Sequence, residues 1–97
     1  MSGKAIKLTA FDAADYLETP EDIAVFVNDA LVTNDPRQIN HALGIAARAK
    51  GMSAVARDAE LGRESLYKAL KEEGNPSFST ILRVFNALGI KITAQAA

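Results

Sequence analysis

Residues that start and end helices punctuate this chain at short intervals, and no other feature of the sequence constrains its fold as strongly. Thr19-Pro20 and Asp35-Pro36 each place a capping side chain before a proline at the first helical position. Ser77 is a further N-cap, and Gly51 and Gly74 can end the helices that precede them. The sequence therefore predicts an all-α fold, a compact bundle of five to six short helices.

Apolar residues recur at helical spacing between these boundaries and are expected to form the core. Two regions are less regular. Thr9 and Asp12 have the spacing of a capping box for a short helix through Leu17, and residues 90–93 alternate apolar and polar, as a short C-terminal strand or a frayed tail would. The core stripes are Ile23, Phe26, Val27, Ala30 and Leu31; Ile39, Leu43 and Ala46; and Phe78, Ile81, Leu82, Phe85 and Leu88.

The composition is typical of one globular domain covering residues 1–97. Hydrophobic residues make up 48% of the 97 residues, which supplies a small core, and pairing with a second copy is expected to complete it. The chain has no cysteine, which excludes disulfides, thiol catalysis and thiolate metal sites and suits a reducing cytoplasm. No apolar run approaches the roughly 18 residues of a membrane span, so no membrane partner is expected.

The charges are divided along the chain, although they nearly cancel in total. Residues 1–35 contain two basic and seven acidic side chains, a net charge of −5, whereas residues 36–97 contain nine basic and five acidic side chains, a net charge of +4. Such asymmetry indicates two surfaces with different partners. Random variation over a solvated surface is the alternative explanation that the charges alone leave open.

Catalysis is not expected from this chain. His41 is its sole histidine, and no serine or cysteine is arranged beside it as a nucleophile. The carboxylate pairs Asp12/Asp15 and Glu21/Asp22 fall at predicted helix starts, where acidic groups stabilise the helix dipole. We therefore expect no enzyme, no metal site and no cofactor.

Residues 53–70 fit a helix-turn-helix, in which two helices cross steeply across a very short turn. The first helix needs a small residue where the second passes over it, and Ala56 occupies that position. Leu61 follows the turn and can fill the joint. The core side of the second helix is formed by Leu66, Ala69 and Leu70.

The opposite side of this second helix has the composition of a DNA-reading surface. At about 100° per residue, Arg63, Glu64, Tyr67, Lys68 and Lys71 fill one continuous arc. Arginine and lysine pair with guanine edges or phosphates, tyrosine can donate to phosphate, and glutamate can accept from cytosine. An ordinary solvated amphipathic helix would show the same division, but the order of helix, turn, charged helix and capped apolar helix favours DNA binding.

Two residues depart from the usual helix-turn-helix pattern. Glu60 occupies the turn position where glycine is common, because the backbone there favours a left-handed conformation. A side chain at that position costs about 1 kcal/mol. Gly62 stands where serine or threonine would cap the second helix better.

Four stretches of the chain resemble addiction-module antidote proteins, relatives of the Xre/Cro-type antitoxins. The resemblance extends over about residues 6–93, and its third and fourth stretches are the most specific. They are Phe11-Asp12-Ala13-Ala14-Asp15-Tyr16-Leu17, Arg48-Ala49-Lys50-Gly51-Met52-Ser53, Arg63-Glu64-Ser65-Leu66-Tyr67-Lys68-Ala69-Leu70 and Gly74-Asn75-Pro76-Ser77-Phe78.

This resemblance implies a lambda-repressor-like helix-turn-helix in a homodimer that binds its own operator DNA and neutralises a cognate toxin, commonly a RelE/ParE-like ribonuclease or gyrase poison. Because such toxins tend to be basic, the acidic segment 1–35 would face the toxin and residues 36–93 would form the DNA-binding core. Within the acidic segment the candidate toxin contacts are Asp12, Asp15, Tyr16 and Glu18.

Two other functions remain open at the level of sequence. One is a stand-alone Xre/Cro-type transcriptional regulator without a toxin partner, which a neighbouring reading frame for a basic protein would argue against. The other is a protein-binding adaptor whose helix-turn-helix has lost DNA affinity, which salt-dependent binding to upstream DNA would exclude.

Overall fold

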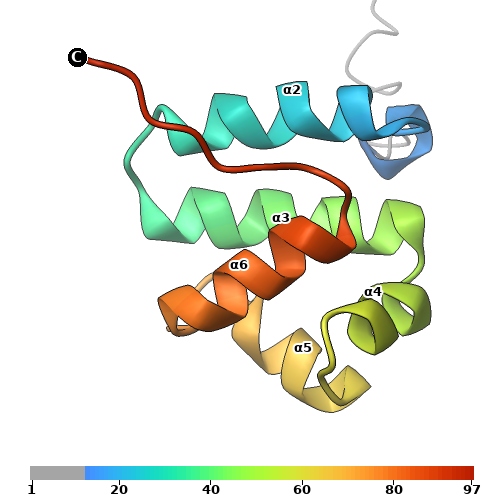
Figure 1. The fold of residues 1–97 in the computed structure, drawn as a ribbon. Coiled ribbons are helices and arrows are strands. Elements are labelled where there is room, and N and C mark those ends of the chain that lie inside the picture. Colours follow the sequence, from blue (N-terminus) through green and yellow to red (C-terminus); the bar gives the residue numbers. More distant parts are fainter. Residues whose placement is uncertain (1–12) are drawn as a thin grey trace, which may run out of the picture.

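The computed structural model describes residues 13–97, which form helices joined by short connections (Figure 1). Within these residues there is no strand, so the predicted all-α class is confirmed. None of the helices in this range has the length and apolar content needed to cross a membrane. The elements are the 3₁₀ helix η1 (Ala13–Tyr16) and the α-helices α2 (Pro20–Leu31), α3 (Pro36–Lys50), α4 (Met52–Asp58), α5 (Arg63–Ala69) and α6 (Phe78–Ala87).

The helix starts follow the predicted caps closely. At α2, Thr19 Oγ1 accepts a hydrogen bond of 3.1 Å from the Asp22 amide, and the Asp22 carboxylate accepts one of 3.1 Å from the Thr19 amide, which completes a capping box. At α3, Asp35 accepts from the Arg37 amide at 3.0 Å. Gln38 has the spacing to complete a capping box there, but its side chain donates to the Asp35 carboxylate instead, because Thr33 Oγ1 accepts from the Asp35 amide.

Helices α2 and α3 run antiparallel, and α4, α5 and α6 lie on the other side of α3 (Figure 1). Every α-helix contributes to one continuous core, and α3 contributes alanines that let its neighbours approach closely. Each large side chain removed from water stabilises the fold by about 1.5–3 kcal/mol. The largest fully buried side chains are Val27 on α2, Leu43 on α3, Val55 on α4, Leu66 on α5 and Val84 and Leu88 on and after α6.

The apolar stripe of α6 is rotated relative to the prediction. Phe78 was expected in the core but is 67% exposed, and Leu82 is 46% exposed. Val84, which the predicted stripe omitted, is fully buried together with Leu88, and these two define the direction of the core. At about 100° per residue, Phe78 and Leu82 lie about 120° and about 160° from Val84 around the helix, which turns them away from the core.

The two ends of the described chain also differ from expectation. Residues 90–93 form no strand; Ile90 is buried in the core and Ile92 packs against it, while Lys91 and Thr93 line a groove beside α2. Both isoleucines therefore pack on the core of their own chain. At the other end, Thr9 and Asp12 of the predicted capping box lie outside the described residues, and a single turn, η1, precedes Leu17.

Candidate nucleic-acid interface

The helix pair α4 and α5, predicted to form a helix-turn-helix, is joined by residues 59–62. Glu60 has φ +59°, so the left-handed turn position predicted from the sequence is confirmed with a glutamate in it. The Leu61 amide donates to the Ala56 carbonyl at 2.9 Å, which closes the turn. Gly62 begins α5 with extended backbone and no side-chain cap, as its lack of a side chain requires.

The inner side of α5 is anchored in the core. Leu66 is fully buried and Leu70 is 6% exposed, while Ala56 of α4 is buried beneath them. Leu61 is half-buried and packs against the same cluster, as predicted for the residue that fills the joint. These contacts fix which side of α5 faces outward.

The outward side of α5 presents four of the five predicted DNA contacts. Arg63, Glu64, Tyr67 and Lys68 are all exposed. The Arg63 guanidinium lies 5.8 Å from the centroid of the Tyr67 ring, a cation–π contact between residues one helical turn apart. Within residues 13–97 neither Arg63 nor Lys68 forms an ion pair, so their charges are available to an anionic partner.

Lys71, the fifth predicted contact, does not lie on α5. The helix was expected to continue to Gly74 but ends at Ala69, with Leu70 as its C-cap. Gly74 folds back over the end of the helix so tightly that a β-carbon on it would lie 2.6 Å from the Ala69 carbonyl oxygen and 2.7 Å from that of Lys68. Lys71 is therefore an exposed residue of the turn that follows α5.

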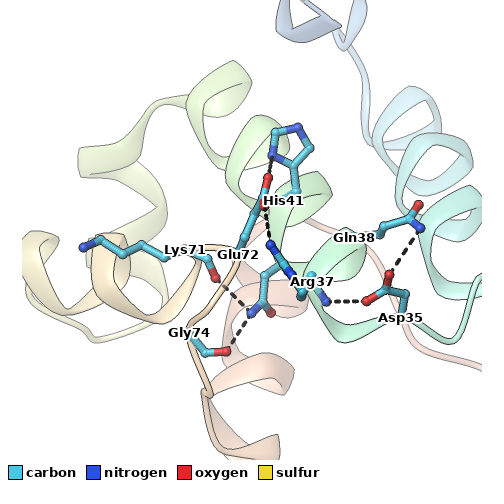
Figure 2. A network of polar contacts seen from close by, with 8 residues as sticks. Asp35, Arg37, Gln38, His41, Lys71, Glu72 and Gly74 are labelled. Atoms are coloured by element: carbon cyan, nitrogen blue, oxygen red, sulfur yellow. Dashed lines mark hydrogen bonds and ion pairs between the residues drawn. The ribbon is translucent and has the colours of Figure 1, made fainter.

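Asn40 holds this turn in place, and the sequence reasoning missed it. It is a residue of α3, 4% exposed, and its Nδ2 donates to the Lys71 and Gly74 carbonyls, both at 3.0 Å (Figure 2). The signal was available: Asn40 lies three residues before Leu43 on the apolar side of α3, where a polar side chain requires a buried partner.

Two carboxylates near α5, Glu72 and Asp58, lie beside arginine side chains. Glu72 lies 3.5 Å from the Arg37 guanidinium and 3.5 Å from His41 Nδ1, both on α3 (Figure 2). Arg57 and Asp58 at the end of α4 form a pair at 3.2 Å. His41 is an exposed residue of α3.

The acidic side of the molecule is formed by η1, α2 and their connections. Residues 13–35 contain six carboxylates and neither lysine nor arginine. Of the predicted toxin contacts, Asp15, Tyr16 and Glu18 are exposed here, and Asp12 lies outside the described residues. The outer face of α2 adds two exposed valines, Val25 and Val32, in line with Asp29.

One carboxyl on this side has a shifted pKa. The amides of Glu18 and Thr19 donate to Asp22 Oδ2 at 3.0 and 3.1 Å. These hydrogen bonds stabilise the ionised form and lower the pKa of Asp22 from its ordinary value of 3.8.

Comparison with known proteins identifies the family to which the chain belongs. A model of the family described as "probable addiction module antidote protein" matches residues 7–96. The chain belongs to this family. It is also 43% identical over 89 residues to an uncharacterized protein of Haemophilus influenzae (strain ATCC 51907 / DSM 11121 / KW20 / Rd), with 92% of each chain covered. No solved structure gives a significant match.

The antidote family implies a cognate toxin as a partner. The matched residues include the acidic side formed by η1 and α2 as well as the helix pair α4–α5. Both surfaces therefore belong to the part of the chain that the antidote family shares.

Proposed function

We propose that this protein is the antitoxin of a toxin–antitoxin module, that it neutralises a RelE/ParE-like toxin, and that it represses its own operon through a helix-turn-helix formed by α4 and α5. The observation that supports DNA binding best is the division of α5. Leu66 is fully buried on one side, whereas Arg63 and Lys68 are exposed and outside any ion pair within residues 13–97 on the other. A recognition helix in the major groove needs this division.

The exposed residues of α5 have distinct roles in this proposal. Arg63 and Lys68 reach guanine edges or phosphates, Tyr67 donates to a phosphate, and Glu64 accepts from a cytosine amine. Lys71, in the turn beyond α5, contacts the phosphate backbone. Two copies of the chain bind half-sites about one helical turn apart, so the operator has the two-fold symmetry of a homodimer.

The toxin binds the acidic side in this proposal. Asp15, Tyr16 and Glu18 contact it, together with Asp12, and the outer face of α2 extends the same surface. A basic toxin would be attracted by the six carboxylates of residues 13–35, which have no lysine or arginine among them. The two functions use different sides of the chain, so substitutions can separate them.

Removing the acidic segment is not a clean test, because α2 supplies Ile23, Val27 and Ala30 to the core. Surface substitutions are better. The paired variant Arg63→Ala/Lys68→Ala is expected to lose the shift of DNA from immediately upstream of the gene, while it still rescues cells that express the product of the adjacent reading frame. All of its changes are at exposed positions, so thermal stability stays within about 0.5 kcal/mol.

The paired variant Glu18→Lys/Asp29→Lys is expected to do the opposite, binding the upstream DNA but failing to rescue. Its control is Glu60→Lys/Glu73→Lys, which reverses the same number of exposed carboxylates outside the acidic side and should still rescue. Rescue by Glu18→Lys/Asp29→Lys would refute the acidic toxin surface. Operator binding with no toxin in the adjacent frame would favour a stand-alone Xre/Cro-type regulator.

A further inference from the structure

We infer that Asn40 is a positioning residue of the DNA-binding surface, which acts from α3 by fixing the turn after α5 and thereby the place of Lys71 against DNA. This inference rests on the proposed function, because it concerns how the same surface is held. Asn40 itself is buried and touches no DNA in this account.

The contacts of Asn40 bridge distant parts of the chain. Its single amide nitrogen has two hydrogens, and both are used, one on the Lys71 carbonyl and one on the Gly74 carbonyl. It is the one buried polar side chain among residues 13–97. Burying an amide without partners is costly, so this position selects the turn geometry in which both carbonyls face α3.

Neither aspartate nor leucine, the residues most similar to asparagine in size and shape, reproduces this contact. Aspartate has no hydrogen to donate when ionised, and leucine has the size but no donor. The same turn geometry also requires glycine at position 74, because any β-carbon there would collide with the carbonyls at the end of α5. Asn40 and Gly74 therefore hold the turn between them.

The consequence for charge is visible at two adjacent residues. The Lys71 carbonyl faces Asn40 and its side chain extends away from the polar network, whereas the next residue, Glu72, points toward Arg37 and His41 (Figure 2). The held turn thus presents a cation outward and keeps the neighbouring carboxylate against α3. Loss of the Asn40 contacts would free the turn and bring the Glu72 carboxylate into competition with phosphates for the nearby cations.

The test compares Asn40→Leu with Val84→Ala in the full chain, using DNA from immediately upstream of the gene. Val84 is fully buried on α6, so its truncation lowers stability without touching the turn. At a temperature where circular dichroism shows both variants folded, Asn40→Leu should bind about tenfold more weakly. Val84→Ala should bind as the unmodified chain does.

Two readouts separate positioning from general destabilisation. Asn40→Leu should reduce the slope of log affinity against log salt by about one, as the loss of one phosphate contact would. Adding Lys71→Ala to Asn40→Leu should weaken binding no further, because both changes remove the same contact. If Asn40→Leu does not fold, Gly74→Ala disturbs the same turn and should give the same salt slope and the same lack of additivity.

Unchanged affinity and salt slope in Asn40→Leu, or full additivity with Lys71→Ala, would overturn the inference while leaving the proposed function intact. Failure of the unmodified chain to bind the upstream DNA would overturn the proposed repressor function and the inference with it.

Discussion

Replacing Leu66 with alanine tests which side of α5 faces the core. Leu66 is the one buried residue of α5, and it is fully buried. Leucine-to-alanine changes at such sites cost about 2–5 kcal/mol, because they lose burial and leave a cavity. For a domain of this size, each kcal/mol lowers the melting temperature by about 4–8 °C, so a fall of at least about 8 °C is expected.

The neighbouring Tyr67→Ala is the matched control. Tyr67 is 47% exposed and lies on the outward side, so its truncation should change stability by less than about 1 kcal/mol. Thermal unfolding followed by circular dichroism, at one fixed protein concentration, measures both variants. A melting temperature nearly unchanged in Leu66→Ala, with a large fall in Tyr67→Ala, would show that α5 is turned the other way and would remove the basis for its DNA-reading face.

Four further predictions concern single residues. Thr19→Ala should lower the free energy of unfolding by about 1 kcal/mol in urea titrations, because it removes the cap of α2. Because the pKa of Asp22 is lowered in the folded protein, its ionised carboxylate stabilises the fold above about pH 4, and this stabilisation is lost as the pH falls through the folded-state pKa. Asp22→Asn should therefore flatten the acid limb of a curve of stability against pH. An unchanged acid limb would contradict the assignment. Glu60→Gly should leave the free energy of unfolding within about 1 kcal/mol, because relief of the left-handed strain is offset by a more flexible unfolded chain. The same change should tighten operator binding in a gel shift, because it removes a carboxylate. Weaker binding would count against the position of this turn beside DNA. Phe78→Ser should leave the melting temperature almost unchanged, because Phe78 lies outside the core, and a fall of several degrees would restore it to the core.

The sequence was a good guide to local structure, because caps and helical periodicity act over a few residues. Thr19 and Asp35 start their helices as predicted, and the left-handed turn position was found at Glu60 even though a glutamate occupies it. These features depend on hydrogen bonds and backbone angles within one turn of chain.

The misses at α5 and α6 share a different cause, since each depends on a partner far away in the sequence. The turn after α5 is hydrogen-bonded to Asn40, 31 residues before Lys71, and periodicity alone extended the helix through this turn. The core direction of α6 is set by what Val84 packs against, which left Phe78 exposed. The predicted DNA contacts were placed on one side of a single helix, whereas one of them, Lys71, lies in the turn after that helix.

The salt dependence of binding to the upstream DNA tests the central claim most directly. Fluorescence anisotropy at several salt concentrations would be measured for the unmodified chain, for Lys68→Ala on α5, and for Lys91→Ala, an exposed cation of the segment beside α2. We predict a steep negative slope of log affinity against log salt, reduced by about one in Lys68→Ala and unchanged in Lys91→Ala. Binding that is absent or independent of salt, or an equal change in both variants, would contradict the assignment of α5 as the helix that meets DNA.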